Sequence, residues 1–479
     1  VKWCCDGGTE FEMEAGSRAA RGTEITLHLG KDGEDFLSEY TVRSTIEKYC
    51  SFMPYPIYFE ESDKEPEKDK DGNLIITEPE PLNEVAPLYL KQPNACTDEE
   101  YKTFYQKTFR DFKEPLFWIH LNMDYPFNLK GILYFPKLNT EFDTMEGQIK
   151  LYNNQVFVAD NIKEVIPEFL LLLKGVIDCP DLPLNVSRSF LQNDGFTRKI
   201  SDYITKKVAD KLNSLFKSDR KDFEKFWDDI SPFIKYGILK DNKFYEKVES
   251  ILLYKTTDEL YLTLEEYLEK YSGKVEKQVY YVSDLQQQSQ YIKMLKDYEL
   301  EAIILDHVID GAFISHIEMK KNDIHFKRVD SDVSDLMKDE ALDEETSKKG
   351  LEILTKIFNK ALQKEDAKIQ LENLKSEDVA GMIILAEESR RMQEMMKRYS
   401  MGGFNSGMMP SEEILVLNRK HLLIQYLLNH GAEETELLEL IAHQVYDLAV
   451  LSHKQLSPEA LTDFVKRSNE IMKQMIQQK

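Results

Sequence analysis

The sequence predicts a multidomain protein of mixed α+β and α/β type, with a layered α/β middle part and a mainly helical C-terminal part. Its 479 residues are too many for one hydrophobic core and favour about three domains. Segments with the alternation of strands and segments with helical spacing follow one another to about residue 330, and helical patterns dominate the remainder.

The first two segments differ sharply in composition. Residues 1–60 combine strand-like alternation, as over 25–29, with a helix-like stretch. The chain begins with Val1 inside a strand-like stretch and not with methionine, so we expect a fragment of a longer protein. Residues 61–85 are rich in Glu, Asp, Lys and Pro, which predicts a charged linker or a mobile hairpin.

Two α/β units are expected after this linker, a larger one over residues 86–275 and a smaller one over 276–330. In the larger unit, strand patterns cover residues 116–121, 131–136, 149–152 and 155–158, and helical patterns cover 162–174 and 196–218. In the smaller unit, strand patterns over 277–282 and 301–305 flank a helix over 283–297.

Residues 331–479 are expected to form a C-terminal domain that opens with an acidic linker. Ser411, after a proline and before two glutamates, predicts the start of a helix that ends at Asn429. Ser457 followed by Pro458 predicts the start of the last helix, because proline is tolerated at the first helical position.

The composition argues against several classes of partner and site. The formal net charge of −24 argues against nucleic acid and against anionic membranes. The five cysteines are scattered without a CxxC pair, which favours a reducing compartment, the cytoplasm, over a disulfide framework. The nine histidines form no HxxxH or HExxH cluster, so no metal site is expected. No signal peptide and no apolar run of about 18 residues is visible, so no membrane span is expected.

The most informative stretch is DLPLNVSRSFLQND, residues 181–194. Arg188 lies in an apolar run after turn-forming residues, and Gln192 shares its face if the stretch is helical. A guanidinium in this setting can be aimed at a phosphate supplied from elsewhere. From the residues alone, a buried structural ion pair is the commoner explanation.

This stretch resembles the catalytic-arginine loop of the ninety-kilodalton heat-shock chaperone family, whose bacterial members are called high-temperature protein G. Other segments match the family in the same order: Arg21–Leu29, Glu114–Leu116, Gly131–Pro136, Lys150–Tyr152 and Lys174–Asp178. The resemblance covers essentially the whole chain. It implies a fragment that lacks most of the N-terminal ATP-binding domain, with residues 1–60 as the last part of that domain.

The resemblance implies an ATP-dependent molecular chaperone. Arg188 would contact the γ-phosphate of ATP held in the N-terminal domain, Gln192 would help to hold the closed arrangement, and Asn185 would shape the loop. Phe142 would contribute to the interface with the N-terminal domain, although packing in an ordinary core remains the alternative. Thr23 matches a nucleotide-contacting threonine.

No GxGxxG or GxxxxGK[ST] phosphate loop occurs in the sequence. We therefore expect ATP with Mg²⁺ to bind only in the full-length ATPase. The fragment alone is expected to bind no cofactor and to be inactive.

A methionine-rich helical face consists of Met392, Met395, Met396 and Tyr399. A helix packed on its own domain is the usual explanation for such a face. The polar, glycine-rich neighbours and the deformability of methionine favour binding of unfolded or partly folded client proteins, which the resemblance also implies. Tyr89 lies where relatives often carry a tryptophan implicated in client contact, with an ordinary surface aromatic as the alternative.

Two apolar stripes near the C-terminus must either fold back on their own domain or pair across a two-fold axis. The resemblance favours a homodimer through Leu437, Ile441, Val445, Leu448, Phe464, Ile471 and Met475. The chain ends in Gln477-Gln478-Lys479, without the acidic peptide that recruits tetratricopeptide co-chaperones in eukaryotic relatives. The alternative hypothesis is an ATP-independent holdase and dimerisation scaffold.

Overall fold

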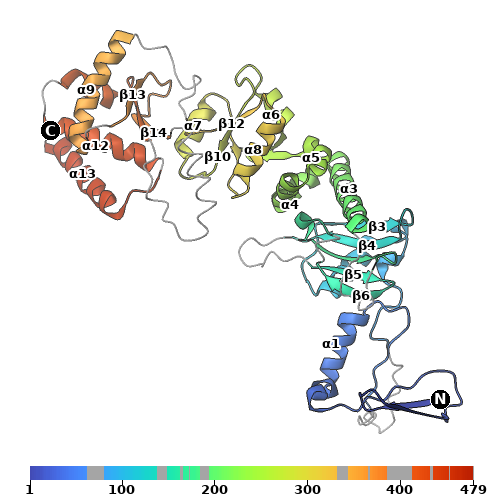
Figure 1. Cartoon of the computed structure of the whole chain (residues 1–479). Helices are drawn as coiled ribbons and strands as arrows, with labels where there is room; N and C mark the ends of the chain where they lie inside the picture. Colours follow the sequence, from blue (N-terminus) through green and yellow to red (C-terminus); the bar gives the residue numbers. More distant parts are fainter. Residues whose placement is uncertain are drawn as a thin grey trace, which may run out of the picture.

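The computed structural model describes residues 1–61, 80–137, 148–161, 166–171, 173–183, 194–331, 344–364, 367–385, 413–431, 435–452 and 454–477. Within these ranges the architecture is a mixed α/β fold of several small sheets with helices against them (Figure 1), which confirms the predicted fold class. None of the described helices has both the length and the apolar composition that a membrane crossing requires.

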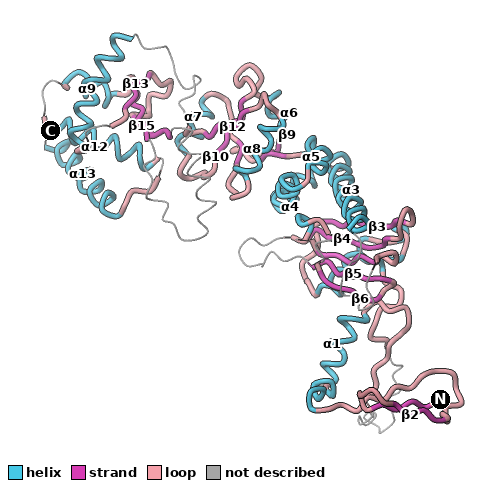
Figure 2. Tube along the Cα trace, in the orientation of Figure 1, coloured by secondary structure: helices cyan, strands magenta, loops and turns pink. Residues whose placement is uncertain are grey.

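The N-terminal region is a two-stranded hairpin followed by a helix. The hairpin pairs β1 (Lys2–Cys5) with β2 (Phe11–Glu14) in antiparallel register, and a 3₁₀ turn (Lys31–Leu37) precedes α1 (Glu39–Cys50). Apolar side chains in the first 29 residues, including Trp3, Ile25 and Leu27, are largely exposed. The region therefore has no core of its own, and α1 leads from it to the rest of the chain (Figure 2). Phe52, in the turn after α1, is buried.

The largest sheet has five strands in the order β3-β4-β7-β5-β6. The strands are β3 (Phe117–Met123), β4 (Leu129–Phe135), β5 (Gln148–Asn153), β6 (Val156–Asp160) and β7 (Lys174–Asp178). Strand β7 is antiparallel to β4 and parallel to β5. The end of β7 thus lies beside the end of β5 and the start of β4.

Both faces of this sheet are covered. One face packs against α3 (Asp194–Ser218) and α4 (Arg220–Lys240), and α5 (Asn242–Val248) packs against these two helices. The other face carries an aromatic cluster with α2 (Asp98–Phe109) and the 3₁₀ turn Leu88–Leu90. Gly131 lets β4 approach β7 closely, because a Cβ there would lie 2.3 Å from the Val176 carbonyl oxygen.

A second region follows, built around a three-stranded parallel sheet in the order β11-β10-β12. Its elements are β8 (Leu253–Lys255), β9 (Tyr261–Thr263), α6 (Leu264–Lys270), β10 (Gln278–Val282), α7 (Ser289–Asp297), β11 (Ile303–Ile304), α8 (Asp310–Lys320) and β12 (His325–Arg328). Its buried side chains are continuous with the helical side of the large sheet.

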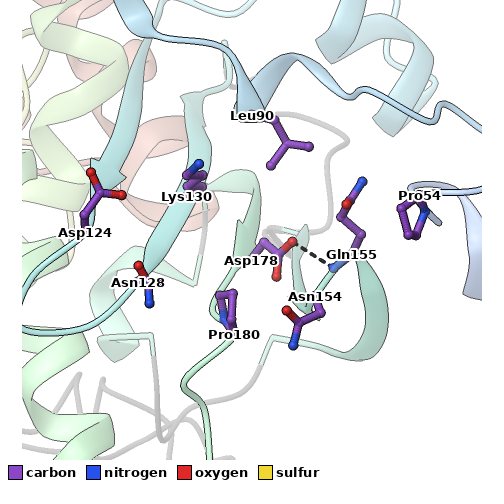
Figure 3. Close-up of a pocket in the computed structure, with 9 residues that line it drawn as sticks. All are labelled: Pro54, Leu90, Asp124, Asn128, Lys130, Asn154, Gln155, Asp178 and Pro180. Carbon is purple, nitrogen blue, oxygen red and sulfur yellow. Dashed lines mark hydrogen bonds between the residues drawn. The ribbon is translucent and has the colours of Figure 1, made fainter.

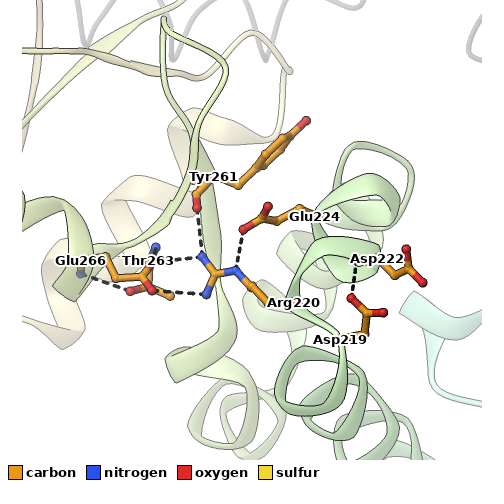
Figure 4. A network of polar contacts seen from close by, with 7 residues as sticks. All are labelled: Asp219, Arg220, Asp222, Glu224, Tyr261, Thr263 and Glu266. Atoms are coloured by element: carbon orange, nitrogen blue, oxygen red, sulfur yellow. Dashed lines mark hydrogen bonds and ion pairs between the residues drawn. The ribbon is translucent and has the colours of Figure 1, made fainter.

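Arg220 at the start of α4 ties these two regions together (Figure 4). Its guanidinium donates to Glu224 Oε1 at 2.7 Å, to the Tyr261 carbonyl at 2.9 Å and to Glu266 Oε2 at 3.0 Å. Glu266 also closes a capping box with Thr263 at the start of α6. This bidentate arginine therefore fixes the angle between α4 and the β9–α6 corner.

The C-terminal region has a three-stranded sheet, β13-β15-β14, between helices (Figure 2). Its elements are α9 (Glu344–Leu362), β13 (Ile369–Glu372), β14 (Gly381–Leu385), β15 (Glu413–Asn418), α11 (Leu422–His430), α12 (Glu436–Leu451) and α13 (Pro458–Gln477). A separate hydrophobic core joins α9, α11 and α12 to this sheet.

Two predicted helices are wrong. The described part of the helix expected over 162–174 is a 3₁₀ turn at Glu168–Leu170, and the chain enters the sheet at Lys174, the first residue of β7. The helix expected from Ser411 to Asn429 divides into β15 and α11, because the run Ile414–Leu417 pairs with strands on both sides. The predicted helix over 196–218 is confirmed as α3.

Candidate functional site

The residues predicted to carry the chemistry lie largely outside the described residues. This holds for Arg188, Gln192, Asn185 and Phe142, and likewise for Met392, Met395, Met396 and Tyr399. Thr23 is described and is exposed, in a segment that is neither helix nor strand. The structure describes the residues that lead from β7 into the arginine stretch, 179–183, which we call its root. It also describes the helix α3 that follows the stretch.

The root is held by hydrogen bonds from the neighbouring strand ends. The Cys179 N–H donates to the Tyr152 carbonyl at 3.0 Å. The Asn153 side-chain amide donates to the carbonyls of Cys179 and Pro180, each at 3.1 Å. These bonds fix the direction in which the chain leaves the sheet.

Asp181 adds a third tie, from the side of β4. Its Oδ2 accepts from the Asn128 backbone N–H at 2.6 Å and from the Asn128 side-chain amide at 3.0 Å. Leu182 is buried in the hydrophobic core that also contains residues of α3. The root is thus pinned both by polar contacts and by an apolar anchor before the arginine stretch begins.

Asp178, the last residue of β7, is a buried carboxylate with a relative exposure of 4%. Its Oδ2 accepts from the Gln155 N–H at 2.9 Å and lies 3.4 Å from the Tyr89 hydroxyl, while its Oδ1 has no hydrogen-bond partner among the described residues. Burial raises the pKa of the Asp178 carboxyl, and the hydrogen bonds from Gln155 and Tyr89 offset part of this change.

A polar hollow of about 350 Å³ opens beside Asp178 (Figure 3). It is lined by Pro54, Leu90, Asp124, Asn128, Lys130, Asn154, Gln155, Asp178 and Pro180. Two carboxylates face a single ammonium there, so the hollow does not suit a triphosphate. The arrangement positions a chain segment and does not by itself supply phosphate chemistry.

The chain was compared with known protein families and with curated proteins. The model of the family described as "Hsp90 protein" matches residues 59–479. The chain belongs to the Hsp90 family. The protein named "Chaperone protein HtpG" from Bacteroides thetaiotaomicron is 37% identical over 98% of this chain and 79% of its own length.

Further relatives agree with this assignment. The "Chaperone protein htpG" of Bacteroides fragilis is 40% identical over 92% of this chain and 66% of its own length. The "Chaperone protein HtpG" of Porphyromonas gingivalis is 40% identical over 91% of this chain and 65% of its own length. The chain therefore spans between about two thirds and four fifths of these Hsp90-family relatives, and it is a chaperone of bacterial Hsp90 type.

Tyr89, which was expected to contact clients, lies in the interior of this Hsp90-family chain. Tyr89 has a relative exposure of 0% and packs against Phe52 and Phe104 in the aromatic cluster. Its hydroxyl points to Asp178. Its ring is therefore not available to a client protein in this conformation, because the aromatic cluster covers it.

The residues expected at a dimer interface of the Hsp90-family chain differ in how far their side chains are exposed. Val445 is buried in the core of its own chain. Leu437, Ile441, Phe464 and Ile471 are half-buried, and Leu448 is exposed; the side chain of Met475 lies outside the described residues.

The most exposed apolar residues of α13 are not among the residues expected at the interface. Exposed apolar side chains at four positions share one face of α13 by their spacing: Leu461, Val465, Met472 and Ile476. Leu448 and Leu451 of α12 are also exposed. The spacing of these residues along the helix could have separated them from Phe464 and Ile471, which lie on a less exposed side of α13.

The two helices are joined below this face by a buried ion pair. The Arg467 guanidinium contacts the Asp447 carboxylate, and both side chains are less than one-tenth exposed. Arg467 also donates to Gln444 Oε1 at 3.2 Å, and the Gln444 amide donates to Ser468 at 2.9 Å. The polar joint fixes α13 on α12 and leaves the apolar stripe directed outward.

Proposed function

We propose that this Hsp90-family chaperone is driven by ATP and that Arg188 contacts the γ-phosphate of ATP bound in a nucleotide-binding domain. The observation that carries the proposal is the pinned root of the arginine stretch, held by Asn153, Asn128 and Asp181 immediately before it. A charge that must meet a phosphate within hydrogen-bond distance gains from such preorganisation.

The other predicted residues of the nucleotide site are given supporting roles. Gln192 helps to hold the closed arrangement, Asn185 shapes the loop, Phe142 contributes to the interface with the nucleotide-binding domain, and Thr23 contacts the nucleotide. Mg²⁺ accompanies ATP, and no residue of this chain is assigned to it. The five free cysteines support the cytoplasm as the proposed compartment.

The test is Arg188→Ala in the complete gene product. We expect kcat for ATP hydrolysis to fall by about 100-fold or more with little change in ATP affinity, since the contact is made mainly in the transition state. Arg198→Ala removes an exposed arginine of α3 ten residues further on and should leave kcat unchanged. An equal loss of affinity and turnover, or an unchanged kcat, would contradict the role.

We further propose a homodimer through the outer faces of α12 and α13, supported by their exposed apolar stripe. Client proteins are proposed to bind the methionine-rich face of Met392, Met395, Met396 and Tyr399, supported by the sequence alone. Replacing Met395 and Met396 with Ser should weaken suppression of client aggregation, which is measured by light scattering.

A second candidate function is an ATP-independent holdase and dimerisation scaffold. The exposed apolar side chains of the N-terminal hairpin and of α13 favour it, because such surfaces bind partly folded chains without nucleotide. Aggregation suppression that is identical with and without ATP in the complete gene product would favour this function over the ATP-driven one.

A further inference from the structure

Tyr89, Gln155 and Asp178 form a buried contact that links the root of the arginine stretch to a distant part of the chain. Asp178 ends β7, ten residues before Arg188. Its carboxylate is held from two sides, by the Gln155 N–H at 2.9 Å and by the Tyr89 hydroxyl at 3.4 Å. Figure 3 shows Gln155 reaching toward Asp178 from the turn between β5 and β6.

The backbone of that turn is unusual. Asn154 and Gln155 have φ values of 52° and 61°, the left-handed region that glycine adopts without cost. The two residues connect β5 to β6 in the manner of a two-residue hairpin turn. This conformation directs the Gln155 N–H to the Asp178 carboxylate. A positive φ is unfavourable for glutamine, and here it is part of a buried hydrogen bond.

The Gln155 side chain makes the connection to the other part of the chain. Its amide donates to the carbonyl of Phe52 at 2.8 Å and to that of Val85 at 3.3 Å. The two stretches that contain these residues are themselves paired, since Glu84 N–H donates to the Ser51 carbonyl at 2.8 Å. Gln155 therefore touches both stretches that flank residues 62–79.

Asn83 makes this paired unit rigid. Its amide donates to the carbonyls of Met53 at 2.8 Å and Tyr55 at 2.9 Å, and its carbonyl oxygen accepts from Ile57 N–H at 2.7 Å. A displacement of the unit is therefore passed to Gln155 as a whole and from there to Asp178.

We propose that Tyr89, Gln155 and Asp178 are positioning residues: they set the place of the arginine stretch and couple it to the paired stretches around Phe52 and Val85. The inference rests on the proposed role of Arg188. It assigns Tyr89 a hydrogen-bonding task inside the protein. The three residues touch no substrate and act only through the chain segment that Asp178 anchors.

The first experiment is Tyr89→Phe in the complete gene product, which removes one hydroxyl and keeps the ring. We expect kcat for ATP hydrolysis to fall about tenfold, with KM for ATP unchanged within about twofold, because small misplacement of a catalytic group costs turnover more than binding. Gln155→Ala keeps the backbone contact to Asp178 but loses the contacts to Phe52 and Val85, and it should lower kcat in the same way.

Tyr134→Phe is the matched control. Tyr134 is as buried as Tyr89 and lies in the same aromatic cluster, but its hydroxyl donates to the Tyr101 carbonyl at 3.0 Å and does not contact Asp178. It should leave kcat within about twofold of the wild-type value. A loss equal to that of Tyr89→Phe would show a general effect on the core and would overturn the proposal.

A double variant tests whether Tyr89 acts through Arg188. In the Arg188→Ala background, Tyr89→Phe should cause no further loss of kcat, because the group that it positions is gone. A full additional tenfold loss would overturn the proposal.

Hydrogen exchange separates a failure of this inference from a failure of the proposed function. The amides of Cys179 and Leu182 should exchange faster in Tyr89→Phe than in Tyr134→Phe. If Arg188→Ala leaves turnover unchanged, the proposed function fails, and faster exchange would still support the positioning contact. Unchanged exchange at both amides would overturn the contact itself.

Discussion

The large sheet and the C-terminal helix pair differ in how completely they bury their apolar side chains. Both faces of the sheet are covered within the chain, by α3 and α4 on one side and by the aromatic cluster on the other. Helix α13 buries only part of its apolar surface and leaves Val465, Met472 and Ile476 exposed. A closed core serves the fold, whereas an open apolar stripe on a helix indicates a surface that another molecule covers.

The largest expected effect comes from breaking the joint between α12 and α13. Arg467→Ala leaves the Asp447 carboxylate buried without its partner, so we expect a loss of about 3–5 kcal/mol in the stability of this region. Replacing both residues, as in Asp447→Leu with Arg467→Met, should restore much of that loss, because no charge is then buried. Hydrogen exchange of the α12 amides measures both, and an equal loss in the single and double variants would contradict the account.

The next expected effect compares the stability cost of a truncation in the closed core with that of a truncation in the exposed stripe. Leu133→Ala opens a cavity in the large sheet, where Leu133 is fully buried, and should cost about 3 kcal/mol in the free energy of unfolding. Leu461→Ala removes the same atoms from the exposed stripe and should cost less than about 0.5 kcal/mol in the isolated chain. Denaturant unfolding compares the two, and a similar cost at both positions would remove the distinction.

A smaller, pH-dependent effect is expected in the aromatic cluster. Burial lowers the pKa of His120 below its ordinary value of 6.5, and its ring nitrogens face the Tyr101 hydroxyl at 2.7 Å and the Tyr89 carbonyl at 3.3 Å. The folded state thus favours neutral His120, so the unfolded state takes up the proton first and stability falls as the pH drops below 6.5. His120→Gln should make this fall shallower in unfolding curves recorded between about pH 7 and pH 5; an unchanged slope would exclude His120 as a source.

The parts of the fold that follow from local pattern could be predicted. The strands near 117–123, 129–135 and 148–153 and the helix α3 match their predicted segments within a few residues. The apolar run that contains Leu170 and Leu173 carries no clear period, so it fits a buried helix as well as a central strand. Only the pairing of the residues that follow it, Lys174–Asp178, with β4 and β5 decides where the strand begins.

The candidate site could be predicted only in part, for a related reason. The arginine stretch is visible as a contiguous motif, but the residues that pin its root come from other strands. Asn153 and Asn128 act through hydrogen bonds to residues 27 and 53 positions away, which no local pattern reveals. Likewise, the sequence shows that Val445 lies on an apolar stripe, but not that this side of α12 faces its own sheet.

The central claim is that the open stripe of α12 and α13 is completed by a second copy of the chain, and the mass in solution tests it most directly. We predict twice the chain mass for the wild type and the single chain mass for a variant with Val465→Asp and Met472→Asp, because two carboxylates would be buried in the paired stripe. Val308→Asp, at an equally apolar residue that is exposed elsewhere, should remain a dimer. A wild-type chain that is monomeric at micromolar concentration, or a dimer that both stripe substitutions leave intact, would contradict the account.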